Sequence, residues 1–573
     1  MMHSRALVLQ PSAASSQHQS CSRRGALAHP NVLRLLLVAC STAAMAPKTT
    51  AVWFRKCLRL HDNAPLVEAA KRGGRLLPIF VLDPHFARPE FVGAPRYRFL
   101  LESLADLDAS LRKRGSRLCV VRGETESTLD GLFAGACDAL PGVKVDAILW
   151  EEELVEPWGV ARDARVAAAA KARGVAASAV AGGHLLFDPR EVLGACGGKA
   201  PTTMPAMVKA AAALGAVPAP LEAPATLPPP PDRLPDSSVP TLEAMGYEAP
   251  PAAAFGVAGG ESAGLARLEA ALARDGGKWA RAFEKPKTKS TKFDVDPSTT
   301  VLSPYLKFGC VSARLFRARL ADVYAGGPHA QPPTSLLGQL YFREMAYANA
   351  LKHGAAFAQS PSPVCADIPW DDPATDADAA ARLRAWEAGR TGYPFVDAAM
   401  RQLKETGWIH HLARHAVACF LTRGDLWLPW TEGARVFDRD LLDADWAVNN
   451  FNWLGLAGVA SWSPPFFRVY SPVPNHKQSS LNVDDAAGEY VDRFVPELRK
   501  LPAKYKYAPW TAPAAVLAAA GVVLGDTYPR PLVDHKVQSK DNIARFKEAQ
   551  QRNRANKPKP PPKGAPKTKK QKV

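Results

Sequence analysis

Residues 407–420 have the sequence Gly407-Trp408-Ile409-His410-His411-Leu412-Ala413-Arg414-His415-Ala416-Val417-Ala418-Cys419-Phe420, and Asp443-Ala444-Asp445-Trp446 follows shortly after. The first stretch has the spacing of an apolar helix. Polar side chains persist in such a context only when another group satisfies them. We therefore expect the functional site in a helical domain around these residues.

The two histidines His411 and His415 are four residues apart and share one face of a helix. A zinc hydrolase would need a third ligand and a glutamate where Leu412 stands, so the sequence predicts no metal site. Two hydrogen-bonded core histidines and an acid–base pair are the remaining interpretations. The neighbouring charges favour the acid–base pair.

Charged side chains around this pair indicate a bound cofactor. Arg414 is a permanent cation, while Asp443 and Asp445 are carboxylates in an otherwise apolar sequence. One carboxylate can pair with Arg414 and the other can accept a hydrogen bond from a ligand amine, as a heteroaromatic cofactor requires. A glycosidase-type pair fits less well, because residues two apart seldom flank one glycosidic bond.

Upstream, an expected helix start combines hydroxyl groups with free backbone N–H groups in Thr299-Thr300-Val301-Leu302-Ser303-Pro304. Such a start suits phosphates, although helix capping alone would explain the same residues.

The chain has thirteen tryptophans. Five of those in the helical half are candidates for a shared role: Trp370, Trp427, Trp430, Trp446 and Trp453. Trp427 and Trp430 are three apart, so we expect them on one face of the same helix. Tryptophans are usually core or interface residues. A row of them beside a redox cofactor can also pass electrons, and spacing alone leaves both interpretations open.

From residue 49 to 187, β-type apolar runs alternate with amphipathic helices, which predicts an α/β domain with a Rossmann-like parallel sheet. The expected strands are Ala51–Phe54, Leu76–Leu82, Arg117–Val121, Val145–Trp150 and Ala177–Ala181, and the expected helices include Tyr97–Arg112 and Val160–Arg173. No Gly-x-Gly-x-x-Gly turn follows the first strand, which argues against a nicotinamide dinucleotide in this domain.

Four further segments complete the predicted organisation. Residues 1–48 have the Arg-, Ser- and Ala-rich composition of a transit or signal segment, or they precede a true start at Met45. Residues 188–260 are rich in Pro, Ala and Gly and predict a surface linker. Residues 261–525 predict an all-α domain, and residues 526–573 predict a C-terminal helix with a basic disordered tail.

The formal charge of +17 comes wholly from the two ends of the chain. Residues 1–61 contain eight Lys or Arg and residues 551–573 contain nine, with no acid in either segment, so residues 62–550 are neutral overall. Nucleic-acid binding by the folded part would then depend on a local patch. Nine scattered cysteines without a Cys-x-x-Cys pair indicate reduced thiols, and no apolar run reaches membrane-spanning length.

Four stretches carry a family resemblance: Trp53-Phe54-Arg55-Lys56-Cys57-Leu58-Arg59-Leu60-His61-Asp62-Asn63, Val301-Leu302-Ser303-Pro304-Tyr305-Leu306-Lys307-Phe308-Gly309-Cys310, Gly389-Arg390-Thr391-Gly392-Tyr393-Pro394 and the run 407–427. In these stretches the chain resembles the cryptochrome/photolyase family, within it the branch of (6-4) photolyases and animal-type cryptochromes. The resemblance implies an α/β antenna domain, a linker and an all-α C-terminal FAD-binding domain. It also implies an antenna chromophore, either a deazaflavin or methenyltetrahydrofolate.

The resemblance implies roles for individual residues. The phosphate-side contacts would be Thr299, Thr300, Leu302 and Ser303, with Gln339 and Arg343 lining the site. The residues around flavin and adenine would be His411, Arg414, Asp443 and Asp445, with Asp443 paired to Arg414 and Asn449 facing flavin N5. The photoreduction chain would be Trp453, Trp430, Trp370 and, outermost, Trp427, and the catalytic pair would be His411 and His415.

Two functions follow from the resemblance. A (6-4) photolyase repairs (6-4) pyrimidine–pyrimidone photoproducts in UV-damaged DNA by light-driven electron transfer from reduced FAD, with His411 as general acid. The alternative is an animal-like cryptochrome, a blue-light photoreceptor that regulates transcription through transcription or clock proteins, and one protein with both functions fits as well. The family pattern has a tryptophan where this chain has Phe342, and Trp-x-Trp where this chain has Trp453-Leu454-Gly455; these departures favour the photoreceptor. Trp446 and the short basic tail favour repair.

We expect a monomer without a membrane segment. The terminal cluster Pro566-Lys567-Thr568-Lys569-Lys570-Gln571-Lys572-Val573 predicts a nuclear localisation signal. A transit peptide at the N-terminus would instead predict a chloroplast or mitochondrial protein.

Overall fold

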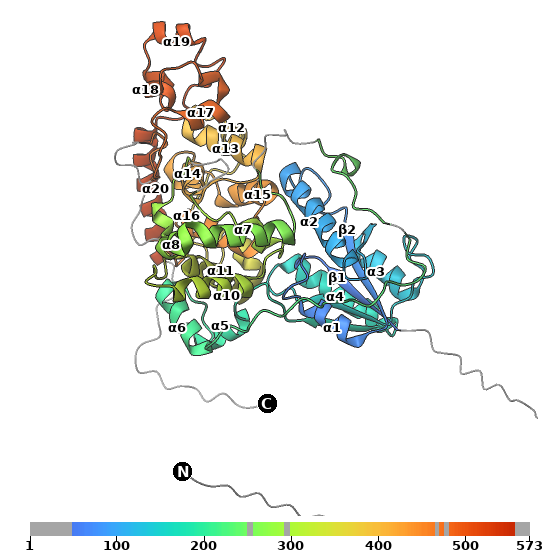
Figure 1. Ribbon diagram of the computed structural model, residues 1–573. Coiled ribbons are helices and arrows are strands. Elements are labelled where there is room, and N and C mark those ends of the chain that lie inside the picture. Colours follow the sequence, from blue (N-terminus) through green and yellow to red (C-terminus); the bar gives the residue numbers. More distant parts are fainter. Residues whose placement is uncertain are drawn as a thin grey trace, which may run out of the picture. The chain divides into compact units, whose positions relative to one another are not determined.

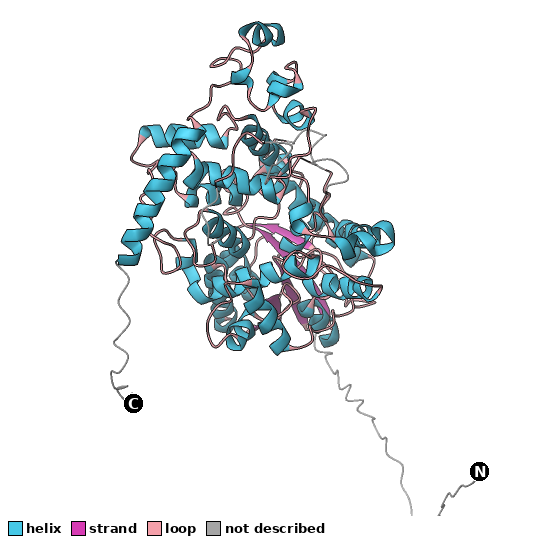
Figure 2. Cartoon of the chain, turned by 90° about the vertical axis from the view of Figure 1, so that its left-hand side faces the viewer, coloured by secondary structure: helices cyan, strands magenta, loops and turns pink. Residues whose placement is uncertain are grey.

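The computed structural model describes residues 48–235, 237–248, 256–291, 298–463, 469–474 and 481–555. The long strands of this part of the chain belong to its N-terminal portion, and helices make up most of the remainder (Figure 1, Figure 2). The architecture is the predicted one, an α/β N-terminal domain followed by a helical C-terminal domain. The predicted tail beyond residue 555 and the segment before residue 48 lie outside the described residues.

A five-stranded parallel sheet forms the centre of the α/β domain, with the order β3-β2-β1-β4-β5. Its strands are β1 (Thr49–Phe54), β2 (Arg75–Leu82), β3 (Cys119–Arg122), β4 (Ala147–Glu151) and β5 (Ala176–Val180). Each predicted strand is present, with ends shifted by one or two residues. The strand order reverses between β1 and β4, and ligands of such sheets bind at the carboxyl ends of the strands near this point.

Both faces of the sheet are buried, which is why its strands are nearly continuous apolar runs. Along β2, Leu76 and Phe80 face one core together with Leu104 of α2, whereas Leu77 faces a second core with Leu129 of α3. The helices between the strands are α1 (Ala64–Arg72), α2 (Ala94–Arg112), α3 (Thr125–Ala134) and α4 (Pro157–Ala172).

The predicted linker at 188–260 is partly a packed structure, which corrects the expectation of a purely surface segment. It contains α5 (Pro189–Ala195), α6 (Met204–Leu214) and a short 3-10 turn, η1 (Glu243–Met245). Met207 on α6 and Val192 on α5 are completely buried. The Pro- and Ala-rich composition concealed these short apolar faces. Farther along, the backbone of Leu76 donates a hydrogen bond of 3.0 Å to Pro229, so the segment also runs against the edge of β2.

The helical domain begins at Glu261, where the sequence predicts it. Its helices are α7 (Glu261–Ala273), α8 (Lys278–Ala282), α9 (Ser303–Lys307), α10 (Ala313–Ala325), α11 (Leu336–His353), α12 (Ala377–Glu387), α13 (Pro394–Thr406), α14 (His411–Cys419), α15 (Trp430–Asp440), α16 (Trp446–Leu456), α17 (Glu489–Phe494), α18 (Ala503–Lys506), α19 (Ala514–Ala520) and α20 (His535–Ala555). Among the described residues, no helix combines the length and apolar character that crossing a membrane requires.

Candidate functional site

The helix that carries the two histidines is α14. Its N-cap is His410, whose Nδ1 accepts a hydrogen bond of 3.2 Å from the backbone N–H of Leu412. The rings of His411 and His415 lie 5.8 Å apart on one side of the helix, as their spacing predicts. After Cys419 the helix widens into a π-helical turn, η5 (Phe420–Gly424).

A polar cluster of Ser303, Arg414 and Asp443 lies beside α14, and we call it the flavin cluster. Arg414 donates two hydrogen bonds to the carboxylate of Asp443, at 3.0 and 2.9 Å, so the pairing implied by the resemblance is present. The hydroxyl of Ser303 donates to the same carboxylate at 2.6 Å. Three distant segments therefore meet at one bidentate ion pair, whose geometry is specific as well as favourable.

Lys285 is a functional candidate that sequence reasoning missed. Burial and, to a smaller extent, the charge of Arg414 lower the pKa of its amine to about 8. The pKa of His411 lies well below its usual value, first because of burial and then because of Lys285 and His410. His411 is therefore neutral at pH 7 in the protein alone. No periodic pattern surrounds Lys285, so only the folded arrangement identifies it.

Asp445 occupies a different setting from Asp443. It is buried at the N-cap of α16, where its Oδ1 accepts a hydrogen bond of 3.1 Å from the N–H of Val448. The hydroxyl of Tyr347 donates to Oδ2 at 2.5 Å. One turn along α16, the side chain of Asn449 donates to the carbonyl of Ala434 at 2.9 Å.

Three of the predicted cofactor residues make contacts of other kinds. Gln339 donates to the carbonyl of Pro333 at 3.1 Å, and the guanidinium of Arg343 donates to the carbonyl of His184. Thr299 accepts a 3.2 Å bond from the N–H of Val301, whereas no polar contact joins Thr300 to the flavin cluster in the described part of the chain. Val301 has a φ of 50°, a conformation that is strained for a β-branched residue.

The donor set of this region fits FAD. Lys285 and Arg414 are cations suited to a diphosphate, and Ser303 adds a hydroxyl group. Asp445 and Asn449 offer an acceptor and an amide to the heteroatoms of flavin or adenine. Together with the helical fold, this set defines a flavin-binding site.

Two pairs of tryptophans adjoin the site. Trp453 of α16 lies against Gly433 of α15, where a Cβ would come within 2.1 Å of the indole, so only glycine permits this approach. Trp430 begins α15 one turn before Gly433. Trp370 and Trp427 form the second pair, with ring centroids 4.8 Å apart. Trp386 of α12, which the sequence did not single out, lies 6.4 Å from Trp453.

Two expectations about Trp427 are wrong. It lies before α15 with a φ of 55°, so it does not share a helix with Trp430. It is also completely buried, whereas Trp370 is partly exposed, so Trp427 is not the outermost member of the row. The reason is α20, whose Arg545 places its guanidinium 4.3 Å above the Trp427 ring. Figure 1 shows α20 running along one edge of the helical domain.

The missing tryptophan at position 455 has a spatial substitute. The indole of Trp462 lies beside Gly455, 3.3 Å from where a Cβ would be. It stacks on Phe451 with centroids 4.7 Å apart and an angle of 4° between the ring planes. Phe342, the other departure, is 37 % exposed, and the amine of Lys285 lies 5.7 Å from the centre of its ring. The aromatic surface next to α16 is therefore present, but it comes from another segment.

A second candidate site is a cavity of about 370 Å³ at the carboxyl ends of the strands, which we call the interdomain cavity. Its walls include Lys56 after β1, Glu153 and Trp158 after β4, and Lys307 and Asp445 of the helical domain. The rings of Trp158 and His85 stack with centroids 5.0 Å apart. Sequence analysis missed this cavity because its residues come from separate segments, each without a motif.

Comparison with known proteins agrees with this description. Residues 50–228 match the family model described as DNA photolyase, and residues 336–548 match the FAD binding domain of DNA photolyase. A (6-4)DNA photolyase of Oryza sativa subsp. japonica is 41% identical over 91% of this chain and 94% of its own. Cryptochrome-1 of Gallus gallus is 40% identical over 87% of this chain and 78% of its own.

Solved structures give the same result. A bacterial class III photolyase from Agrobacterium tumefaciens has a TM-score of 0.72 at 29% identity, covering 90% of this chain and 100% of its own. A Synechocystis cryptochrome has a TM-score of 0.73 at 25% identity, covering 87% and 99%. The chain belongs to the DNA photolyase/cryptochrome family, and FAD is its cofactor.

Proposed function

We propose that this protein repairs (6-4) pyrimidine–pyrimidone photoproducts in DNA, using light and reduced FAD. The observation that carries the proposed chemistry is the placement of His411 and His415 on one side of α14, next to the Arg414–Asp443 pair. The resemblance implies that animal cryptochromes share this histidine pair, so the pair alone does not separate repair from photoreception. The 41% identity to a rice (6-4)DNA photolyase over nearly the whole chain supports it.

Bound FAD supplies the electron that reduces the lesion, and after repair the electron returns to the cofactor. The reduced lesion is more basic than the intact one, so it takes a proton from a positioned acid. His411 holds that proton, and His415 supports the charge that His411 carries. Arg414 and Asp443 would hold the cofactor near the place where the damaged base enters after it leaves the duplex.

The pKa of His411 adds a condition to this mechanism. Burial, Lys285 and His410 hold the pKa well below 6.5 in the protein alone. The negative charge of DNA phosphates and of the reduced lesion opposes the effect of Lys285, so the pKa of His411 rises when substrate is bound. The acid is then charged only in the complex in which it is used.

The deciding experiment is illumination of the FAD-bound, reduced protein with an oligonucleotide that carries one (6-4) photoproduct. A second oligonucleotide with a cyclobutane dimer serves as the control. Restoration of intact thymines from the first substrate alone is the expected result, measured by chromatography of the digested product. Absence of restoration would refute the repair function.

The His411→Ala variant tests the assigned acid. It should abolish repair while flavin content, measured by absorbance, is unchanged. A variant that repairs at the wild-type rate would show that another group donates the proton.

A blue-light photoreceptor is the second candidate function. The departure at Phe342 favours it, since an indole lost from a binding surface weakens recognition of a base by about 1–3 kcal/mol. The 40% identity to Cryptochrome-1 of Gallus gallus supports it as well. A photoreceptor would bind transcription or clock proteins differently in light and darkness, and repair of the (6-4) oligonucleotide would be absent if this were the sole function.

The interdomain cavity would hold the antenna chromophore in either case. Trp158 and His85 offer a stacking surface for a flat ring, and Arg55, Lys56 and Lys307 favour an anionic group. The absorption spectrum of a chromophore retained by the protein distinguishes a deazaflavin from methenyltetrahydrofolate.

We also propose that the protein is a monomer and that it acts in the nucleus. The basic segment 566–573 would direct it there, and fusion of this segment to a fluorescent protein tests that function. Import into chloroplasts or mitochondria by residues 1–48 would instead indicate an organelle protein. Sedimentation of the FAD-bound chain measures its oligomeric state.

A further inference from the structure

A segment of the α/β domain reaches into the helical domain, and we call residues 182–187, which follow β5, the strap. The N–H of His184 donates to Glu151 of β4 at 3.1 Å. The N–H groups of Leu186 and Phe187 donate to the buried carboxylate of Glu344 on α11, at 3.1 and 3.2 Å. The strap is therefore fixed to both domains through its backbone.

The strap also approaches its neighbours very closely. A Cβ at Gly182 would lie 1.6 Å from a carboxylate oxygen of Glu151. A side chain at this position would require the Glu151 side chain to move.

The ring of His184 meets two side chains of α11. Its Nε2 lies 2.7 Å from the hydroxyl of Tyr347, and the guanidinium of Arg343 donates to the same nitrogen and to the His184 carbonyl. Arg343 is always a donor, so Nε2 of His184 is the acceptor in that contact and carries no proton. Burial and, next to it, the charge of Arg343 lower the pKa of His184 to about 3, in agreement with a neutral ring.

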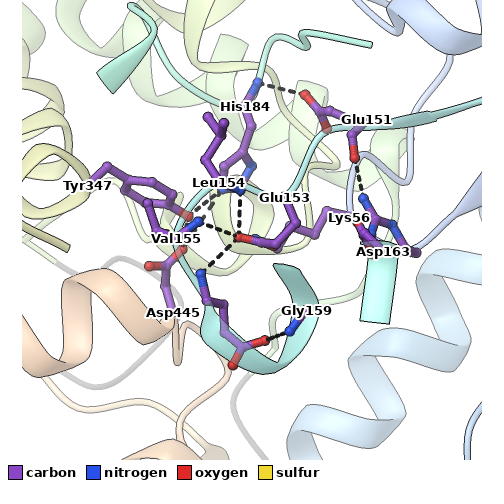
Figure 3. A network of polar contacts seen from close by, with 12 residues as sticks. Lys56, Glu151, Glu153, Leu154, Val155, Gly159, Asp163, His184, Tyr347 and Asp445 are labelled. Carbon is purple, nitrogen blue, oxygen red and sulfur yellow. Dashed lines mark hydrogen bonds and ion pairs between the residues drawn. The ribbon is translucent and has the colours of Figure 1, made fainter. Parts of the chain in front are cut away.

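This assignment fixes the direction of the Tyr347 hydroxyl. A hydroxyl has a single proton to donate, and the lone pair of His184 Nε2 is already used by Arg343. The proton of Tyr347 therefore goes to Oδ2 of Asp445 at 2.5 Å. Figure 3 shows the side chains of His184, Tyr347 and Asp445 converging from the two domains.

Both oxygens of Asp445 are then oriented. Oδ1 accepts from the backbone of Val448 at the start of α16, and Oδ2 accepts from Tyr347. The same helix carries Asn449 and Trp453 one and two turns farther along. A change at Tyr347 would release one side of a carboxylate that begins this helix.

We propose that Tyr347 is a positioning residue of the flavin site, which orients Asp445 for FAD, and that His184 acts through it because the Arg343-occupied lone pair of His184 leaves Asp445 as the acceptor of the Tyr347 proton. The α/β domain thereby contributes to FAD affinity without touching the cofactor. The proposal rests on the proposed assignment of Asp445 to the cofactor site. The competing explanation is that the contact merely joins two domains.

The Tyr347→Phe variant separates these explanations when it is compared with Tyr528→Phe. Tyr528 is also completely buried, and its hydroxyl donates to a buried carboxylate, that of Asp397, at 2.6 Å. Asp397 is not among the residues of the flavin cluster. Loss of either hydroxyl removes one hydrogen bond to a carboxylate, so similar losses of stability are expected.

The experiment measures FAD binding to the full-length protein after removal and re-addition of FAD, by quenching of flavin fluorescence. Tyr347→Phe should raise the dissociation constant about tenfold, as expected when one charge-assisted hydrogen bond is lost. Tyr528→Phe should change it by less than about twofold. Thermal unfolding of both variants without FAD checks that they fold and lose comparable stability. FAD affinity equal to wild type in Tyr347→Phe would overturn the proposal.

A double-mutant cycle tests the part played by His184. His184→Ala should weaken FAD binding about threefold in the wild-type background and have no further effect in Tyr347→Phe, because it acts through the tyrosine. Equal effects in both backgrounds would show that His184 acts elsewhere and would overturn the proposed path.

The Asp445→Asn variant distinguishes failure of this inference from failure of the site assignment. If Asp445→Asn retains wild-type FAD affinity, Asp445 is not a cofactor residue and the assignment itself fails. If Asp445→Asn weakens binding but Tyr347→Phe does not, the assignment stands and the positioning role is wrong.

Discussion

The flavin cluster and the interdomain cavity use buried charge in different ways. In the cluster, Arg414, Asp443 and Ser303 bind one another and present the remaining polar surface to a cofactor. In the cavity, the Lys56–Glu153 pair at 2.5 Å lies in a wall that is otherwise largely aromatic and aliphatic. Polar contacts should therefore dominate binding in the cluster, and stacking should dominate it in the cavity.

The largest effect should come from Arg414→Ala. The change leaves Asp443, whose side chain is 7 % exposed, with Ser303 but without its cation. We expect loss of FAD from the purified protein and a fall of about 3 kcal/mol in the free energy of unfolding. Flavin absorbance and denaturant titration measure these quantities. The control is Arg435→Ala, which removes an exposed ion pair with Glu432. It should lower the free energy of unfolding by less than about 0.5 kcal/mol.

Trp158→Ala should affect the cavity alone. Removal of the indole that stacks on His85 should weaken retention of an added deazaflavin by about 2 kcal/mol, or roughly thirtyfold. Equilibrium dialysis measures the retention, and FAD content should be unchanged. A simultaneous loss of FAD would show that the two sites do not bind independently.

Trp430→Phe should slow photoreduction of FAD roughly tenfold, because the family resemblance assigns Trp430 to the electron-transfer chain. Trp427→Phe should have a smaller effect, below about threefold, since Trp427 is buried beneath the cation of Arg545. Absorbance under blue light with an added reductant measures both rates. Equal rates in the two variants would contradict this ranking.

The smallest effect concerns pH. Burial raises the pKa of Glu151 from 4.5 to about 7. The stability that the protonated Glu151 side chain contributes is therefore complete below pH 4.5 and is lost as the pH rises through 7. Glu151→Gln should remove this loss and stabilise the protein by on the order of 1 kcal/mol at pH 8, with no gain at pH 5. Thermal unfolding at the two pH values measures the difference.

Glu153 should behave in the opposite way. Burial would raise its pKa, but Lys56 holds it at about 2. Its stabilising contribution is therefore present above pH 4.5 and declines as the pH falls toward 2. A Glu153→Gln variant that gained stability at pH 8 to the same extent as Glu151→Gln would refute the assigned role of Lys56.

The sequence predicts those parts of the molecule that depend on local pattern. The five strands and the α14 face with His411 and His415 follow from periodicity, and the Arg414–Asp443 pair follows from a resemblance carried by motifs. The interdomain cavity could not be predicted from local pattern, because its walls come from the ends of separate strands and from two domains. Burial of Trp427 was equally hidden, since the residue that covers it, Arg545, is more than a hundred positions away.

The indole of Trp462 beside Gly455 has a consequence for comparison among relatives. The resemblance implies a tryptophan at position 455, and the folded chain places the indole of Trp462 beside that position instead. Restoring tryptophan at 455 alone would put two indoles into one volume and would overpack the region. The two positions are thus epistatic: a path between this chain and a relative with tryptophan at 455 would change both, in an order that keeps one ring in place throughout.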